Sequence, residues 1–416
     1  MSQTKNILFI SYDGMTDPLG QSQVIPYLVG LSKHGYSFTI LSCEKPGSFV
    51  KYNAYVEGLL RPHNIKWEFI PYHKRPPVFS SVYDVMMLKR KAGQLHAKER
   101  FDMVHTRAGI PSLIGLWMKK KFGVKFMHDI REFYADSRVE GGMWNRDNIF
   151  YRRIYLFFKG KEREEIKNCD GIVCLTYAAK EIIKKWPDYR EAIPLEVIPC
   201  SVDLDLFDPA KISSVTKNAL KKELGIEDND FIVSYLGSTG GWYLTDEMMK
   251  FCKIISDKIP AARFLFITPD QHGTIFETAR KFGIRDEQII VKHARRHEVP
   301  LLLSLSNYSV FFIKPCYSKQ SSSPTKHGEI MAMNIPVITN SGVGDVAEIV
   351  RKYKSGIVLK EFKEEEFQSA AQSIANEFSS GIYPADRSTI RMGAIEYYNL
   401  NKAVEKYCKI YKAVLK

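Results

Sequence analysis

The sequence contains no run of apolar residues near the ~20 that a membrane-spanning helix needs. Its longest runs, such as residues 110–118, have the length of a core strand or core helix. The first residues enter a predicted strand at once and lack the regions of a signal peptide. The seven cysteines are odd in number and scattered, which argues against a disulfide framework or a zinc cluster. We therefore expect a protein of the reducing cytosol.

Composition and length place the chain among ordinary globular proteins. Hydrophobic residues make up 45% and charged residues 26% of the 416 residues, which excludes wholesale disorder. A chain of this length predicts two domains. The formal charge of +13 is concentrated in residues 1–200, which hold 31 Lys and Arg against 21 Asp and Glu, whereas residues 201–416 hold 29 against 26. An acidic partner is therefore expected to meet the first half.

Short apolar runs alternate with helical patterns in both halves, which predicts parallel sheets and an α/β fold. The predicted strands include 6–11, 36–42, 102–105, 124–128, 171–175, 195–199, 231–236, 262–268, 288–291, 310–313 and 336–339. We expect two Rossmann-like domains facing across a cleft, residues 1–200 and 201–385, followed by a C-terminal helix within 386–416. Residues 199–222, rich in Asp and Ser, are interpreted as a linker. Ligands of such sheets bind at the carboxyl ends of the strands.

The segment 321–340, S-S-S-P-T-K-H-G-E-I-M-A-M-N-I-P-V-I-T-N, predicts a loop that enters a helix at about Thr325. Pro324 suits the first turn of this helix, and Ser322 or Ser323 could cap it. A helix N-terminus offers free N–H groups and a partial positive charge, which suit a diphosphate. We therefore expect donor contacts from Ser323 and Thr325.

Two charged residues follow in the same predicted helix. Lys326 adds a full positive charge within the first turn, and Glu329, one turn further, can accept two hydrogen bonds from a ribose diol. A solvent-exposed pair of Lys326 and Glu329 is an equally simple interpretation, because charged pairs at this spacing are common on helices.

A glycine-rich turn, G-S-T-G-G at 237–241, follows a predicted buried strand. Gly237 and Gly240 let the backbone approach a phosphate, and Ser238 and Thr239 can donate hydroxyl hydrogen bonds. A tight turn that needs positive φ angles is at least as simple an explanation.

Two motifs do not support their obvious interpretation. D-L-D at 203–205 matches a metal-binding pattern but falls in the predicted linker, so we expect no metal there. The basic cluster 292–297 is short and lacks the interleaved aromatic residues of a nucleic-acid-binding surface. It follows a strand, where the backbone of His293, Ala294 and Arg295 could bind a nucleotide base.

His128 and Asp129 end a predicted strand of the first half, with Arg131 and Glu132 beside them. His128 could hydrogen-bond a sugar hydroxyl, and Asp129 could orient it or act on the acceptor, with Arg131 on the acceptor side. For an isolated His-Asp pair, a histidine tied to a neighbouring backbone and an aspartate capping the next turn is favoured.

The loop D-G-M-T-D-P-L-G-Q-S-Q at 13–23 should open a helix at the inner face of the first domain. Gly20 and Gln21 could contact an acceptor or approach the donor phosphates. A plain turn between strand and helix is the simpler interpretation.

Basic and aromatic residues mix in I-F-Y-R-R-I-Y-L-F-F-K-G-K at 149–161, with further lysines and arginines at 119–121 and 89–91. A helix of this kind can lie on anionic lipid, where each basic residue contributes ~1 kcal/mol. A core helix whose cations reach past apolar neighbours to solvent is an equal alternative.

The order of elements, with V-I-P-C-S-V-D-L-D-L-F-D-P at 197–209 and S-P-T-K-H-G-E-I-M-A at 323–332, resembles the family 4 retaining glycosyltransferases of GT-B fold. Residues 12–23 and 129–144 are similar to a bacterial subgroup associated with cell-surface polysaccharide assembly. The resemblance covers nearly the whole chain. It implies an acceptor-side first domain, a nucleotide-sugar-binding second domain and a C-terminal helix that packs back on the first.

The resemblance also implies roles for single residues. Glu329 matches the second glutamate of the family's Glu-x7-Glu motif and would bind the ribose, whereas Ser321 stands where the first glutamate is expected. The Arg and Lys that the family carries after the first strand of domain two are absent from 237–243. Lys326 is then the expected diphosphate anchor, and His128 matches the family's strand-end histidine near the donor sugar.

The implied reaction transfers a hexose-type sugar, with retention, from a nucleotide diphosphate sugar to a glycan or lipid-linked glycan. The donor, taken as UDP-linked, is a substrate, and neither a metal nor a cofactor is expected. The expected location is the cytoplasm or the inner face of the membrane. A sugar-nucleotide epimerase using His128, Asp129 and Glu329, and a degenerate binding protein suggested by Ser321, are the alternatives.

Overall fold

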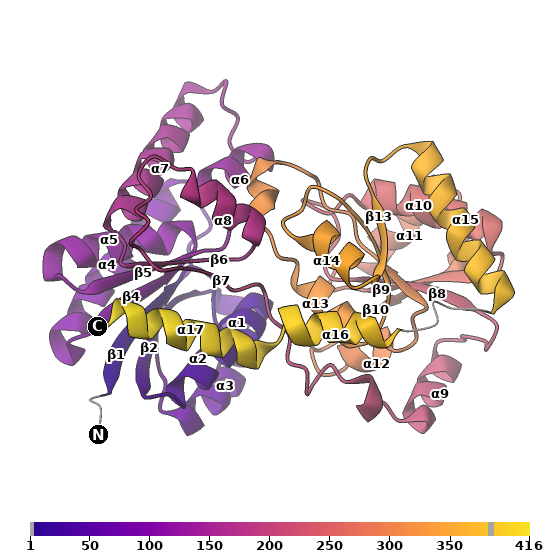
Figure 1. The fold of residues 1–416 in the computed structure, drawn as a ribbon, viewed down its shortest axis with the longest axis horizontal. Helices are drawn as coiled ribbons and strands as arrows, with labels where there is room; N and C mark the ends of the chain where they lie inside the picture. The colour runs from indigo at the N-terminus through magenta and orange to yellow at the C-terminus, as the bar shows by residue number, and fades with distance from the viewer. Residues whose placement is uncertain (1–3, 382–386) are drawn as a thin grey trace. The chain divides into compact units, whose positions relative to one another are not determined.

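Residues 4–381 and 387–416 are described by the computed structural model (Figure 1), which divides into two units. The N-terminal unit comprises Met1–Ser201, Gln320–Ser322 and Leu400–Lys416, and the second unit comprises Val202–Lys319 and Ser323–Asn399. Each unit is built on one parallel sheet, of 7 and 6 strands within the described residues. The predicted α/β class with two parallel sheets is confirmed.

The sheet of the N-terminal unit has the strand order β3-β2-β1-β4-β5-β6-β7. Its strands are β1 (Lys5–Ser11), β2 (Tyr36–Glu44), β3 (Lys66–Pro71), β4 (Met103–Arg107), β5 (Lys125–Ile130), β6 (Gly171–Cys174) and β7 (Leu195–Val197). Its helices are α1 (Pro18–Gln23), α2 (Ile25–Ser32), α3 (Pro46–Leu60), α4 (Phe79–Glu99), α5 (Gly109–Phe122), α6 (Tyr134–Glu140), α7 (Ile149–Asn168), α8 (Tyr177–Lys184) and α17 (Leu400–Val414). Inner strands such as β1 are apolar and buried because helices cover both faces of the sheet.

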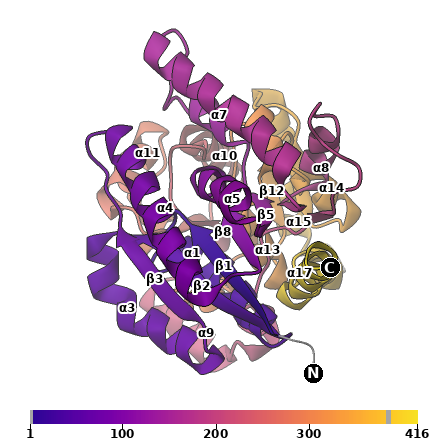
Figure 2. The same cartoon turned by 90° about the vertical axis from the view of Figure 1, so that its left-hand side faces the viewer.

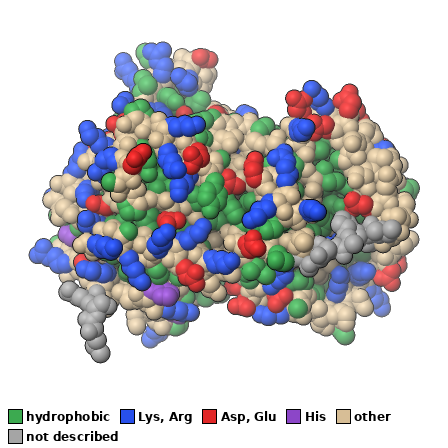
Figure 3. All heavy atoms as spheres, in the orientation of Figure 1, with side chains coloured by type: hydrophobic (Ala, Val, Ile, Leu, Met, Phe, Trp, Pro, Cys, Tyr) green, Lys and Arg blue, Asp and Glu red, His purple; other side chains and the backbone are tan. Residues whose placement is uncertain are grey.

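Two apolar layers sandwich this sheet (Figure 2). One layer is built from side chains of α4, α5, α7 and α8, and the other from side chains of α2, α3 and α17. Figure 3 shows many Lys and Arg side chains on the surface of this unit, in keeping with the charge of residues 1–200.

The sheet of the second unit has the strand order β10-β9-β8-β11-β12-β13. Its strands are β8 (Phe231–Leu236), β9 (Ala262–Ile267), β10 (Ile289–Lys292), β11 (Tyr308–Val310), β12 (Val337–Asn340) and β13 (Gly356–Leu359). Its helices are α9 (Ser214–Glu223), α10 (Thr245–Lys258), α11 (His272–Lys281), α12 (Val299–Leu303), α13 (Thr325–Ala332), α14 (Val346–Lys352), α15 (Glu364–Ser380) and α16 (Ser388–Tyr397). All strands run parallel, so the loops after β8, β9 and β10 emerge at one edge.

Two sequence predictions in the second unit are corrected. The expected linker 199–222 contains most of α9, because its K-N-A-L-K-K-E run is rich in helix formers. The expected strand 310–313 is β11, which ends at Val310. Beyond Val310, the backbone of Ile313 pairs with a side chain: Asn340 accepts from Ile313 N and donates to Ile313 O, at 2.9 Å each.

The expected C-terminal helix is in fact two helices. Tyr398 O accepts a hydrogen bond from Val202 N at 2.8 Å, and Asn399 forms a parallel bridge with Val202. These backbone bonds end α16, which belongs to the second unit, before α17 begins in the N-terminal unit. Within 4–381 and 387–416 no helix combines the length and apolarity needed to cross a bilayer.

Candidate functional site

Lys326 is held inside the second unit at the carboxyl end of β8. Its Nζ lies 3.2 Å from Tyr235 Oη and 3.6 Å from the centroid of the Tyr243 ring. Gly237, at φ 109°, makes room for the ammonium group, since a Cβ at that position would lie 3.1 Å from Nζ. Lys326 is only 7% exposed, so the interpretation of a solvated surface pair is wrong.

Burial lowers the pKa of Lys326 well below its ordinary value, although Glu329 and Asp270 act in the opposite direction. Glu329 is itself paired with another cation, because Arg296 Nη1 donates to Glu329 Oε1 at 2.7 Å. An anion placed beside Lys326 Nζ would favour its charged form. Whether this edge of the sheet binds an anion depends on Lys326 being charged there, which an anion would itself promote.

The loop after β8 carries aromatic rings where the resemblance led us to expect Arg and Lys. Lys319 Nζ lies 3.7 Å from the centroid of the Trp242 ring, just as Lys326 lies over Tyr243. Rings in these positions attract the cations through their π faces. Lys319 was not predicted, because the short 3₁₀ turn η4 (Tyr317–Ser321) that holds it has no periodic pattern.

The glycine-rich turn is held by Asp270, an aspartate of the loop after β9. Thr239 donates to Asp270 Oδ2 through its N–H at 2.5 Å and its hydroxyl at 2.8 Å. Gly240 has a φ of 72°, which supports the tight-turn interpretation. Of the two predicted hydroxyl donors, Thr239 is occupied by Asp270 and Ser238 is exposed. Gly237 faces Lys326.

The predicted base loop follows β10 at the same edge. His293 and Arg295 are exposed, Ala294 is half-buried, and Arg295 N donates to Glu298 Oε2 at 2.6 Å. Thr268 N donates to Lys292 O at 3.0 Å, which ties this loop to the one after β9. The loop therefore lies at the same edge of the sheet as the loop after β8.

Helix α13 begins at Thr325, as predicted, but the expected serine cap does not form. The N-cap residue is Pro324, which has no side chain that can accept a hydrogen bond. Ser323 is buried beside it, and Ser321 belongs to the N-terminal unit, where its Oγ accepts from Phe133 N at 3.2 Å. A hydroxyl at 321 thus anchors the backbone that follows β5.

The D-L-D motif closes a turn. Asp203 Oδ1 accepts from Asp205 N at 2.9 Å and from Leu206 N at 3.1 Å. In the described part of the chain, no group of three or more His, Cys, Asp or Glu side chains is placed to hold a metal ion.

His128 and Asp129 point in opposite directions. Strand β5 continues to Ile130, two residues beyond the predicted end, and side chains alternate between the faces of a strand. His128 therefore faces the layer of α5 and α7, and Asp129 faces the layer of α17. The two residues do not act as one pair in this unit.

Asp129 is the centre of a buried polar network. Its Oδ2 accepts from Tyr407 Oη at 3.0 Å, and Arg131 Nη1 lies 3.4 Å from Oδ1. Burial raises the pKa of Asp129, but Arg131 and His105 outweigh it and leave the pKa below its ordinary value. His105 in turn contacts Tyr411 Oη at 2.6 Å. In this unit Asp129 and Arg131 belong to the network that fixes α17, while the catalytic role of Asp129 and the acceptor role of Arg131 stay predictions.

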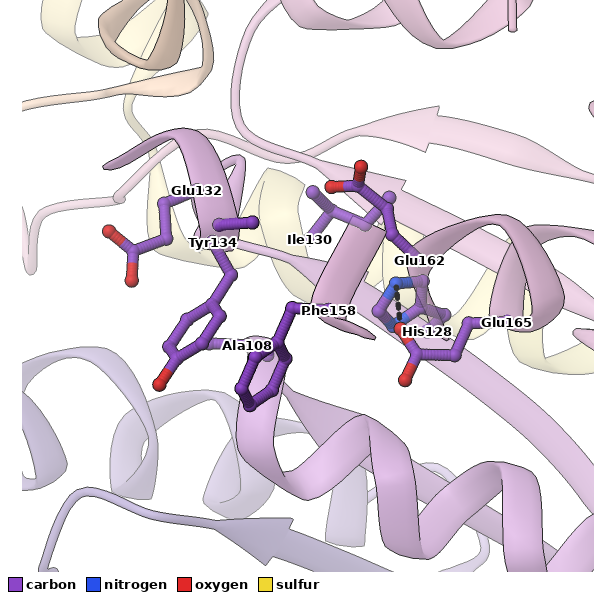
Figure 4. A pocket seen from close by; sticks show the side chains of 10 residues that line it. Ala108, His128, Ile130, Glu132, Tyr134, Phe158, Glu162 and Glu165 are labelled. Carbon is purple, nitrogen blue, oxygen red and sulfur yellow. Dashed lines mark ion pairs between the residues drawn. The ribbon is translucent and has the colours of Figure 1, made fainter. Parts of the chain in front are cut away.

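His128 faces a small pocket between β5 and α7 (Figure 4). Its Nε2 lies 3.8 Å from Glu165 Oε2, and its Nδ1 has no hydrogen-bond partner among the described residues. Burial lowers the pKa of His128 to about 4 and raises the pKa of Glu165 well above its ordinary value, so it disfavours the charged form of both groups. The cavity of about 20 Å³ holds about one water molecule and no sugar ring.

Glu44, at the end of β2, holds the loop after β1. Its Oε1 accepts from Met15 N and Ser42 Oγ at 2.6 Å each, and its Oε2 accepts from Thr16 N at 3.2 Å and Thr16 Oγ1 at 2.5 Å. A Cβ at Gly14 would lie 2.6 Å from the same carboxylate. Sequence reasoning missed Glu44, because no local pattern links it to a loop 28 residues earlier.

The predicted acceptor residues of this loop serve its internal packing. A Cβ at Gly20 would lie 2.3 Å from Gly14 O, so only glycine permits this close approach. Gln21 Nε2 donates to Thr16 O at 3.0 Å. These contacts within the protein fix the conformation of the loop after β1.

Replacing Glu44 with glutamine is expected to raise the acceptor KM about tenfold and leave the donor KM unchanged. The amide offers one acceptor oxygen in place of two, so buried donors of the loop lose their partners at ~1–3 kcal/mol each. Steady-state kinetics with each substrate varied in turn checks this. Exposed Glu57→Gln on α3 is the control. Equal KM values for both substrates in E44Q and wild type would contradict a positioning role.

Comparison with known proteins agrees with this geometry. Residues 24–206 match the family model described as Glycosyltransferase Family 4, and residues 216–378 match Glycosyl transferases group 1. A glycosyltransferase structure from Rickettsia africae ESF-5 superposes with a TM-score of 0.71 and 17% identity over 100% of both chains.

Curated relatives match shorter segments. The alpha-monoglucosyldiacylglycerol synthase of Streptococcus pneumoniae is 22% identical over 34% of this chain and 30% of its own length. The UDP-Gal:alpha-D-GlcNAc-diphosphoundecaprenol alpha-1,3-galactosyltransferase of Escherichia coli is 28% identical over 35% of this chain. The chain thus spans about a third of the length of these relatives, 30% and 34%. With both family models matched in order and both sheets in place, the chain belongs to the family 4 glycosyltransferases of GT-B fold.

Proposed function

We propose that the protein transfers a hexose, with retention and without a divalent metal, from a UDP-sugar to a glycan or lipid-linked glycan. The observation that carries this proposal is the buried Lys326 ammonium beside Gly237, Tyr235 and Tyr243. Among the described residues no carboxylate forms an ion pair with Lys326, and a buried ammonium group without a counter-ion is costly unless an anion joins it. The names of the relatives, a UDP-Gal donor with a diphosphoundecaprenol acceptor and a diacylglycerol glycolipid, support both substrates.

In the second unit the donor diphosphate binds Lys326 and the N-terminus of α13, with Lys319 adding charge at the same edge. Glu329 binds the ribose and shares its carboxylate with Arg296. The base lies on the backbone of 293–295. Charge that builds on the leaving diphosphate is stabilised by Lys326, which is the main catalytic contribution of this unit.

In the N-terminal unit the neutral imidazole of His128, whose Nδ1 has no partner in the described residues, is proposed to reach a sugar hydroxyl through the one water molecule that its cavity holds. The acceptor oxygen attacks the anomeric carbon on the face from which the diphosphate departs. The carbon–oxygen bond to the diphosphate breaks, and the departing oxygen takes the acceptor proton. No protein nucleophile is needed.

The test is transfer from a panel of UDP-sugars to a polyprenyl-diphosphate-linked glycan in the presence of EDTA. We expect a product whose anomeric configuration, read by NMR, is that of the donor. An inverted product or an absolute metal requirement would overturn the mechanism. Epimer formation without acceptor would show an epimerase, and UDP binding without turnover across the panel would show a degenerate protein.

A further inference from the structure

The outward face of α7 is apolar and basic at the same time. The large apolar side chains of this face are 49–62% exposed: Ile149, Phe150, Leu156 and Phe157. Arg152 and Arg153 are exposed between them. A surface helix normally turns such apolar residues to the core and leaves polar ones outside.

The exposed apolar side chains of α7 form a second apolar face, separate from the face that packs on the core. Positions seven apart, such as Ile149 and Leu156, lie two turns apart on the same side of a helix. On the inner side of α7, Phe158 lines the His128 pocket and Ile166 is fully buried in the core. The inner face of α7 therefore packs on the core, and its outer face still exposes a row of large apolar side chains.

Helix α4 repeats the arrangement in its first two turns. Its exposed apolar side chains are Phe79 at 71%, Val82 at 52%, Tyr83 at 46% and Met86 at 57%. Both helices lie in the same layer over the sheet, with α5 between them (Figure 2). Helix α4 follows β3 and α7 follows β5 and α6, so both helices start from the carboxyl edge that carries the His128 pocket.

The charge on these faces is of one sign. Residues 149–161 contain no Asp or Glu, and the single acidic residue of 74–91, Asp84, is buried against Tyr12 and His73. Among the described residues no ion pair neutralises Arg152 or Arg153. In the described part of the chain, no ion pair neutralises four cations of 74–91: Lys74, Arg75, Lys89 and Arg90.

The neighbouring lysines of the predicted basic clusters are used differently. Lys119 pairs with Asp170 at 2.7 Å and Lys91 pairs with Glu68 at 2.7 Å, while Lys120 pairs with Glu164. The expected anionic contact on 149–161 therefore keeps its unpaired arginines, whereas these lysines of the neighbouring clusters 119–121 and 89–91 are paired.

We propose that these faces form a docking surface for an anionic lipid bilayer, in which the apolar side chains enter the interface and the arginines bind lipid phosphates. A second copy of the chain is a poorer occupant, because self-association would bring like-charged arginine rows together. The inference rests on the proposed function insofar as the acceptor is lipid-linked. Docking there would set the carboxyl edge of the sheet beside the lipid headgroups.

The test is co-sedimentation of the full chain with phosphatidylglycerol vesicles and with phosphatidylcholine vesicles. We expect binding to the anionic vesicles that falls with salt. R152Q/R153Q should weaken it about 30-fold at low salt, and L156S/F157S at least about tenfold. V50S/Y55S on α3 is the matched control, since Val50 and Tyr55 are 80% and 57% exposed elsewhere on the same unit. Thermal unfolding checks that every variant is folded.

Equal vesicle binding by wild type and both α7 variants, or none by wild type, would overturn the proposal. Self-association in sedimentation velocity that L156S/F157S abolishes, without vesicle binding, would assign the surface to a second copy instead. Vesicle binding needs no turnover, so its failure is separable from failure of the transfer assay. Vesicle binding without sugar transfer would contradict the proposed function and still support the docking surface.

Discussion

Lys326→Ala is expected to lower turnover on the order of 10²-fold, the loss typical of removing one group that stabilises charge on a leaving oxygen. The same variant should change how UDP binds. Because burial lowers the pKa of Lys326 in the free protein and the diphosphate would raise it, wild-type binding should take up a proton at pH values between the free and the bound pKa. Wild-type affinity for UDP should therefore fall as pH rises, and K326A should lose this dependence. Calorimetry in buffers of different ionisation enthalpy measures the proton uptake directly.

Lys217→Ala is the matched control for that experiment. Lys217, on α9, is a half-buried lysine whose pKa is also lowered, by burial and by its neighbours Lys221 and Arg387. Its removal should leave turnover and proton uptake as in wild type. Wild-type turnover in K326A with every accepted donor would refute the assignment of the diphosphate site.

Asp129→Asn is expected to lower the free energy of unfolding of the N-terminal unit by ~3–5 kcal/mol, because it leaves the buried Arg131 guanidinium without its counter-charge. Urea unfolding followed by circular dichroism measures this. Tyr407→Phe, which removes only the 3.0 Å hydrogen bond to Asp129, should cost less, ~1.5–3 kcal/mol.

The opposite result is equally informative. If D129N unfolded at the wild-type urea concentration but lost turnover, the carboxylate would act on a substrate and the network would not be its main role. The comparison with Tyr407→Phe matters, because that variant disturbs the same network without removing a charge.

Much of the fold could be predicted because buried parallel strands are short continuous apolar runs. Strand β8 was predicted at its exact bounds, and α13 at its exact start. The C-terminal segment was harder, since the break between its helices depends on backbone bonds from Val202, a residue nearly 200 positions earlier.

Site residues could be predicted only where their position depends on local sequence features. Lys326 could be found because helix spacing and a helix N-terminus are local features. His128 and Asp129 lie on opposite faces of β5. Their surroundings depend on which helices cover each face, and no local sequence pattern shows this. Glu44 and Lys319 act through partners distant in sequence, so neither gave a signal.

The path of the backbone has a consequence for biosynthesis. The N-terminal unit takes three separate segments of the chain, the last of which is 400–416. Tyr407 and Tyr411, which close the network around Asp129, leave the ribosome only after the whole second unit has been made. Until then the nascent first unit has one sheet face covered only by α2 and α3, with Asp129 and Arg131 unshielded by α17, so a chaperone that covers this face would prevent aggregation.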